Sequence, residues 1–140
     1  MTLAADAKLE YKDGVEVDLP LAASVTIFTG AFTALNADGY LNPGADTAGF
    51  IFAGVSREHA EGGSAAGDVS ALVRRKGLVK ATIGSTITRA NVGDKVYLVS
   101  DDTLDLAANT TNDILAGIIV EFIDSTHAWV DIEPGVQLQS

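Results

Sequence analysis

The sequence predicts an all-β protein, a small β-barrel or β-sandwich of short strands with an extended N-terminal arm. Three observations lead to this fold class. Short runs rich in Val, Ile, Phe and Tyr are separated at close intervals by Gly, Asn, Asp and Pro, as in strands joined by tight turns. No amphipathic helix of ordinary length occurs along the chain. Finally, one segment of the chain repeats another, which predicts a β-unit used twice.

The internal pseudo-repeat aligns residues 30–68 with residues 93–131 without a gap. Gly30 matches Gly93, Leu41 matches Leu104, and the pair Ala53-Gly54 matches Ala116-Gly117. The match ends at Glu58/Glu121, Ala65/Ala128 and Asp68/Asp131. Each copy is expected to contain a strand, a polar turn, a second strand carrying Ala-Gly, another turn and a third strand. Chance alignment is the alternative, because Ala, Gly and Asp are abundant.

The sequence predicts an N-terminal arm or hairpin over residues 1–19 and a single β-domain over residues 20–140. Leu9 and Tyr11 alternate with charged residues, and the same alternation continues from Val15 to Leu19 until Pro20 ends it. A three-residue loop at Asp13-Gly14-Val15 would pair the two halves as a hairpin. In the alternative, the first twelve residues form an arm that adds to a sheet edge of a neighbouring molecule.

Alternation and turn residues then predict strands along the rest of the chain. They are expected at Val25–Phe28, Phe32–Leu35, Tyr40–Leu41, Phe50–Val55, Val69–Arg74, Leu78–Ile83, Val96–Val99, Ile114–Ile123 and Ala128–Ile132. Thr88 is expected to cap a single helical turn that ends at Gly93. The segment Ile114–Ile123 is apolar on both faces, which predicts a central strand and a second buried surface. We therefore expect a homo-oligomer, with a trimer favoured.

Composition excludes several classes of function. The chain has 140 residues, no cysteine and a net charge of −10, so disulfides and thiolate chemistry are excluded and a nucleic-acid partner is not expected. Its longest apolar run is too short for a membrane span. No acidic residue lies between Asp68 and Asp94, where the basic residues are Arg74, Arg75, Lys76, Lys80 and Arg89. These cations are expected to pair either with the protein's own carboxylates or with a partner.

No catalytic or metal-binding motif is complete, so no enzyme activity, cofactor or metal is expected. Gly62–Gly67 has the glycine spacing of a phosphate loop, but Asp68 stands where lysine is needed. The Asp101-Thr103-Asp105 spacing resembles the start of a calcium loop, yet Leu106 replaces its glycine. His59 and His127 are isolated, and surface or hydrogen-bonded roles are expected for both.

Several segments, in their order along the whole chain, resemble the head decoration, or capsid cement, proteins of tailed bacteriophages. The resemblance lies in Leu19–Ser24, Gly30–Asn36, Phe52–Ser56, Val73–Gly77, Val92–Tyr97, Ala116–Val120 and Trp129–Ile132. It implies an all-β virion protein, made in the bacterial cytoplasm, that binds the outer capsid surface, contacts the major capsid protein and stabilises the shell, commonly as a trimer. It implies no catalytic residues.

The residues expected at a capsid or subunit interface are Leu9, Tyr11, Arg74, Arg75, Lys76, Tyr97 and Trp129. In the last strand, Ala128, Val130 and Ile132 should face the core while Trp129 faces outward. A carbohydrate-binding β-module displayed on a virion is the alternative function, although such modules need exposed rings and aromatic residues are few. A hydrolase with an unrecognised site is a third class.

Overall fold

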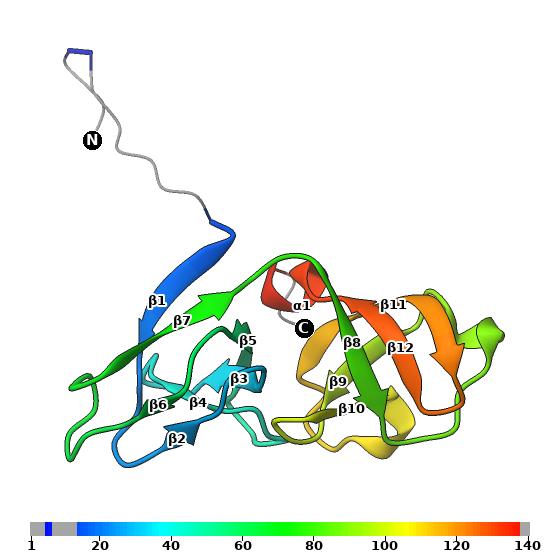
Figure 1. Cartoon of the computed structure of the whole chain (residues 1–140), viewed down its shortest axis with the longest axis horizontal. Coiled ribbons are helices and arrows are strands. Elements are labelled where there is room, and N and C mark those ends of the chain that lie inside the picture. Colours follow the sequence, from blue (N-terminus) through cyan, green and yellow to red (C-terminus); the bar gives the residue numbers. More distant parts are fainter. Residues whose placement is uncertain (1–4, 7–13, 138–140) are drawn as a thin grey trace.

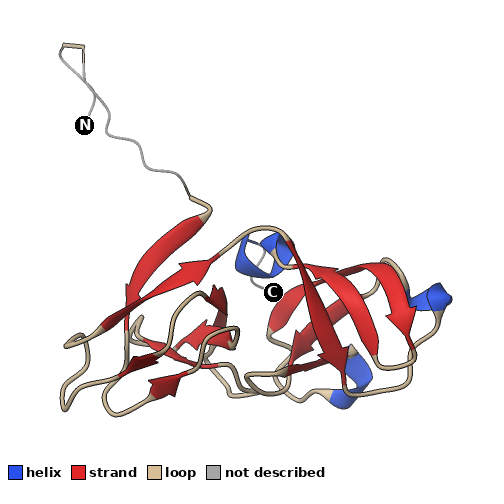
Figure 2. Ribbon diagram, in the orientation of Figure 1, coloured by secondary structure: helices blue, strands red, loops and turns tan. Residues whose placement is uncertain are grey.

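The computed structural model describes residues 5–6 and 14–137, which form short strands and very little helix (Figures 1 and 2). In chain order the strands are β1 (Glu16–Pro20), β2 (Thr26–Ile27), β3 (Phe32–Leu35), β4 (Leu41–Pro43), β5 (Ile51–Ser56), β6 (Ala60–Glu61), β7 (Ser70–Arg74), β8 (Leu78–Ile83), β9 (Lys95–Leu98), β10 (Thr103–Asp105), β11 (Leu115–Asp124) and β12 (His127–Asp131). Two 3-10 turns, η1 (Arg89–Asn91) and η2 (Ala107–Asn109), and the short helix α1 (Glu133–Gln137) complete them. The predicted all-β fold class is confirmed.

The strands form two lobes that lie side by side (Figure 1). The first lobe contains a sheet of order β1-β7-β5-β3-β4, whose ends meet in a parallel bridge between Leu21 and Leu41. The second lobe is a closed barrel of order β10-β8-β12-β11-β9. The small pair β2-β6 belongs to the first half of the chain. We refer to the first lobe as barrel 1 and to the second as barrel 2.

The two barrels repeat one topology, strand for strand. The strands β1, β3, β4, β5 and β7 of barrel 1 correspond to β8, β9, β10, β11 and β12 of barrel 2. Cross-strand pairs of barrel 1 also have equivalents in barrel 2. The antiparallel pairs Leu35↔Leu41, Val17↔Val73 and Val55↔Arg74 correspond to Leu98↔Leu104, Val79↔Val130 and Ile118↔Asp131, in that order. The parallel bridge between Leu21 and Leu41 corresponds to the parallel pair Ile83 and Leu104. Because β1 and β8 take part, the structural repeat begins well before Gly30.

The spacing between equivalent residues changes near the end of the repeat. It is 63 at Ser56 and Ile119 but only 57 at Val73 and Val130, because β6 and its loops lengthen barrel 1. Ala65 and Asp68 therefore lie in the loop before β7, whereas Ala128 and Asp131, which the sequence matches to them, lie in β12. Ungapped alignment could not detect this inserted segment.

The repeated Ala-Gly pair marks a β-bulge in each barrel. The register shifts by one residue at Ala53 in β5 and at Ala116 in β11. A Cβ atom on Gly54 would collide with the carbonyl oxygen of Arg74, and one on Gly117 would collide with that of Asp131. Only glycine lets the neighbouring strand approach this closely at the bulge.

Two apolar clusters form the core, and the larger one joins the barrels. The smaller cluster fills barrel 1, with Leu21, Ile27, Leu41, Ala71 and Val73 among its buried members. The larger fills barrel 2 and also includes Phe32, Ala34 and Phe52, which lie on β3 and β5. The face of barrel 1 that carries these three side chains therefore packs against barrel 2, so the chain forms one body.

The local elements agree in part with the expectations from the sequence. Strand β8 has the predicted bounds, and Thr88 accepts the amide of Ala90 as the expected cap of η1. The proposed boundary at residue 20 falls inside the sheet, because β1 already pairs with β7 from Glu16 onward. The hairpin partners Leu9 and Tyr11 lie outside the described residues. Helix α1 was not predicted, and its Gly135 packs directly on the backbone of Ala116.

Candidate interaction surface

The structure does not gather the predicted interface residues at one place. Arg74 ends β7, and Arg75 and Lys76 lie in the short connection between the two barrels. Tyr97 lies on β9, half-buried, and Trp129 lies on β12 between its cross-strand neighbours Lys80 and Glu121. Leu9 and Tyr11 are not among the described residues. The predicted alternation of the last strand is confirmed, because Ala128, Val130 and Ile132 are buried while Trp129 is half-buried.

The three consecutive cations at the connection mostly contact backbone oxygens. Arg74 Nε donates to the carbonyl of Lys76 at 2.8 Å, and Arg75 Nη1 lies 3.4 Å from the carbonyl of Gly14. Lys76 Nζ lies 3.6 Å from a carboxylate oxygen of Glu133, and both side chains are well exposed. Within the described residues, Lys76 is thus the one member of this trio that forms an ion pair with a carboxylate.

Arg74 shares a groove with Arg57, a residue that the sequence did not single out. Arg57 follows β5, and its Nε lies 2.8 Å from a carboxylate oxygen of Glu16 on β1. Both arginines line two adjoining hollows. One hollow is also lined by Thr29, Gly30, Val55, Ser56, Leu78 and Val79, and the other by Val15, Glu16 and Leu72. The groove therefore places two guanidinium groups beside apolar side chains where the barrels meet.

Exposed apolar side chains lie at the same groove. Leu78, at the start of β8, is 52% exposed and lines the hollow that contains Arg57 and Arg74. Phe28 is 57% exposed, and its ring centroid lies 5.4 Å from that of His59. Phe28 lines a neighbouring hollow that shares Thr29 and Gly30 with the first. Large apolar side chains that remain in water beside charged side chains, here Arg57, Arg74 and Glu16, are typical of a protein-binding surface.

The groove could not be predicted from the sequence, because its residues come from separate segments. Arg57, Arg74 and Leu78 meet only after β5 pairs with β7 and the chain crosses into barrel 2. The one available sequence signal was the acid-free stretch from Val69 to Gly93, which contains Arg74 and Leu78 but not Arg57. Phe28 had no distinguishing signal beyond its place at the end of a short β-rich run.

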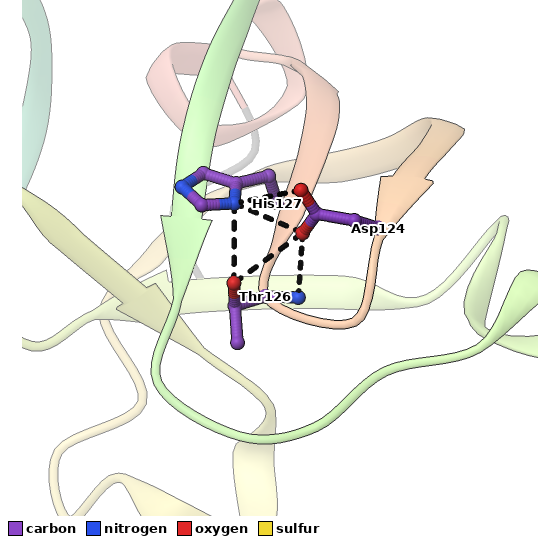
Figure 3. A network of polar contacts seen from close by, with 3 residues as sticks. All are labelled: Asp124, Thr126 and His127. Atoms are coloured by element: carbon purple, nitrogen blue, oxygen red, sulfur yellow. Dashed lines mark hydrogen bonds and ion pairs between the residues drawn. The ribbon is translucent and has the colours of Figure 1, made fainter.

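A polar network at the turn between β11 and β12 resembles catalytic machinery but has a different geometry (Figure 3). His127 Nδ1 lies 2.9 Å from Asp124 Oδ1 and 3.1 Å from Thr126 Oγ1. In a catalytic triad the acid and the hydroxyl contact opposite ring nitrogens, whereas here both contact Nδ1. The backbone amide of Thr126 and then the imidazole of His127 hold the pKa of Asp124 below its ordinary value. The network fixes the turn.

The glycine loop before β7 is filled by the protein's own carboxylate. Asp68 Oδ2 accepts the backbone amide of Ala65 at 3.0 Å, and a Cβ atom on Gly63 would lie only 2.7 Å from the same oxygen. A phosphate group placed there would meet negative charge instead of free amides. The structure thus gives these glycines no phosphate-binding geometry. The interpretation of residues 62–67 as a hairpin loop is wrong, because the loop joins β6, which pairs with β2, to β7, which pairs with β1 and β5 in another sheet.

The described part of the chain contains neither a cluster of metal ligands nor a helix that could span a membrane. No group of three or more His, Asp or Glu side chains there could hold a metal ion. Across residues 5–6 and 14–137, no helix has both the length and the apolar character that crossing a bilayer requires. The sequence matches no protein-family model, and none of the curated proteins searched gives a match.

Proposed function

We propose that the protein is a structural component of a tailed-bacteriophage virion. It binds the outer surface of the capsid, contacts the major capsid protein and stabilises the shell, and it acts as a homo-oligomer, with a trimer favoured. The sequence resemblance to head decoration proteins suggests this role. A protein with this role works by binding and needs no catalytic centre, cofactor or metal.

The observation that carries the proposal is the groove between the barrels. The chain has a net charge of −10, yet Arg57 and Arg74 lie together there, beside the exposed side chain of Leu78. Arg57 is paired with Glu16 at 2.8 Å, so a partner carboxylate would share Arg57 with Glu16. Phe28 lines the neighbouring hollow together with Asp101 and Asp102. Guanidinium groups give orientation and association rate through carboxylates on a partner, while buried apolar side chains supply most of the affinity. The groove is therefore suited to a protein surface that presents carboxylates beside apolar residues.

Cosedimentation with purified capsids tests the proposal. We expect the double substitution Arg57→Ala, Arg74→Ala to weaken binding by about tenfold or more, because two charge-assisted contacts are lost. Arg89→Ala is the matched control, because Arg89 is an exposed cation of η1 outside the groove and its loss should leave binding unchanged. Raising the salt to 1 M, where the Debye length is about 3 Å, should also weaken binding. Binding that resists both treatments would contradict the role of the groove.

The N-terminal twelve residues provide a second test of attachment. If Met1–Lys12 is an arm that adds to a sheet edge on the capsid or on a neighbouring subunit, its deletion should cause a large loss of capsid binding and leave the melting temperature within about a few degrees of the intact protein. The deletion keeps the whole of β1, which begins at Glu16. A collapse of stability with retained capsid binding would instead show that residues 1–12 belong to an intramolecular hairpin.

Carbohydrate binding is the second candidate, and Trp129 is the observation that favours it. Its indole lies on the outward side of β12, with Lys80 and Glu121 as cross-strand neighbours. A partly exposed ring flanked by polar groups can stack on a sugar. Titration of glycans with tryptophan fluorescence as the readout tests this role directly, because Trp129 is the only tryptophan in the chain. A spectrum unchanged by any glycan would count against it.

A further inference from the structure

The contact between the two barrels is directional. The amide of Phe32 in barrel 1 donates to the carbonyl of Asp101 in barrel 2 at 2.8 Å. Asp46 of barrel 1 accepts the amides of Thr111 and Asn112 at 2.8 and 2.9 Å. Barrel 1 thus contributes two parts to the contact, the outer side of β3 and β5 and the loop after β4. Barrel 2 contributes its β9–β10 turn and the loop before β11.

The repeat assigns an equivalent to each side of this contact. The outer side of β3 and β5 corresponds to that of β9 and β11 in barrel 2, where Lys95 replaces Phe32 and Tyr97 replaces Ala34. The β9–β10 turn corresponds to the β3–β4 turn of barrel 1, where Asp38 replaces Asp101. In the described residues the reciprocal hydrogen bond, from the amide of Lys95 to the carbonyl of Asp38, does not occur.

Burial shows that both equivalent surfaces are largely open. Phe32 is 5% exposed and Ala34 is fully buried, whereas their equivalents Lys95 and Tyr97 are exposed and half-buried. On the opposite side, Ile114 is 4% exposed but its equivalent Ile51 is 42% exposed. Leu115, the equivalent of Phe52, is the exception, because it is already buried.

The open side of barrel 2 also has the character of an interface. Tyr97 and Lys95 line a shallow hollow together with Asp94, Leu106, Ala107 and Ala108. On the same strands Ile118 is half-buried, Val120 is 41% exposed, and Val99 just after β9 is 37% exposed. Lys95 and Asp94 are both exposed, and the carboxylate of Asp94 accepts a hydrogen bond from Asn91 Nδ2 at 2.9 Å, so this side of barrel 2 presents one cation and one anion.

We propose that the outer side of β9 and β11 binds the β3–β4 end of barrel 1 in a second copy of this chain. The contact repeats between molecules the one that barrels 1 and 2 make within a molecule. It brings Lys95 of one copy next to Asp38 of the other, so the two exposed charges are complementary. Such a contact is head-to-tail, and it produces a closed ring when the rotation between copies allows closure.

Charge reversal tests this interface with purified protein and no capsid. Light scattering at micromolar concentration should show a discrete oligomer for the native chain. Lys95→Asp and Asp38→Lys should each weaken association about tenfold, because an attractive exposed pair becomes repulsive. The double variant should restore association. Lys80→Asp, which changes the net charge as Lys95→Asp does but lies elsewhere, should leave the oligomer intact.

Cysteine cross-linking tests the register, because the native chain has no cysteine. The equivalent pair within the chain, Phe32 and Asp101, is joined by a backbone hydrogen bond, so the proposed contact brings the backbones of residues 95 and 38 of two copies together. A mixture of Asp38→Cys and Lys95→Cys chains should therefore form a disulfide-linked heterodimer under mild oxidation, and neither variant alone should cross-link.

This inference rests on the proposed self-association and not on capsid attachment, so the two can fail separately. A native chain that is monomeric overturns the interface and the oligomer together. An oligomer that withstands both charge reversals, or that yields no mixed disulfide, overturns this interface alone. Neither result bears on cosedimentation with capsids, which tests attachment.

Discussion

Replacement of the two bulge glycines by alanine separates steric from conformational cost. At Gly117 the backbone φ lies outside the left-handed region, so the cost of an added Cβ atom is steric alone: it would collide with the carbonyl of Asp131 and with Cγ1 of Val130. At Gly54 the same obstacle, the carbonyl of Arg74, is combined with a φ of 129°. Gly39 has a φ of 84° and nothing within 4 Å of an added Cβ atom. It is therefore the control for the conformational cost alone.

The expected magnitudes follow from these surroundings. Gly39→Ala should cost about 1 to 2 kcal/mol, the penalty of a left-handed conformation for an L-residue. Gly117→Ala should cost about 3 kcal/mol, the upper end for overpacking, because the obstacle is strand backbone and cannot rotate away. Gly54→Ala should combine both costs and lose about 4 to 5 kcal/mol. The order of destabilisation is therefore Gly54→Ala, then Gly117→Ala, then Gly39→Ala.

Urea unfolding followed by circular dichroism measures these differences, provided that the m-value stays constant across the variants. If Gly117→Ala proved no more destabilising than Gly39→Ala, the close approach of β12 to the bulge would not be the reason for glycine at that position. Equal losses for Gly54→Ala and Gly117→Ala would show that the left-handed φ at Gly54 carries no cost of its own.

Three further predictions concern local contacts. Thr88→Ala should destabilise the protein by about 1 kcal/mol in urea unfolding, because the cap of η1 is lost, whereas Thr88→Ser should retain most of it. The backbone amide of Thr111 lowers the pKa of Asp46 from its ordinary value of 3.8. The stability that the Asp46 carboxylate gives the folded protein is therefore fully present above pH 3.8 and is lost as the pH falls through the lower pKa of the folded state. Asp46→Asn should flatten the pH dependence of the free energy of unfolding in this range. If a neighbouring chain covers the indole of Trp129, Trp129→Ala should impair oligomerisation, measured by light scattering, or capsid binding, measured by cosedimentation. Unchanged values in both assays would show that no neighbouring chain covers the indole.

The sequence by itself determined the local elements of this protein. Period-two alternation fixes β8 at Leu78–Ile83, because a strand buried on one face needs an apolar residue at every second position. The side chain of Thr88 and the glycine at position 93 predict a single helical turn, and 3-10 turn η1 forms there. The repeated Ala-Gly pair carries information about backbone geometry, because each glycine occupies a bulge that no larger residue fits.

Tertiary structure alone decided which distant segments meet. Strands β1 and β8 belong to the repeat because they pair in the same way with β7 and β12. Their sequences do not show this, because Val17 and Val79 are the one identical pair between Glu16–Pro20 and Leu78–Thr82. Helix α1 forms where Gly135 can rest on the backbone of β11. The groove with Arg57 and the packing of Phe32 against barrel 2 depend on how the barrels dock. Local sequence patterns cannot encode such contacts. They are selected by the burial of apolar surface between segments far apart in the chain, and not by the secondary-structure preference of any one segment.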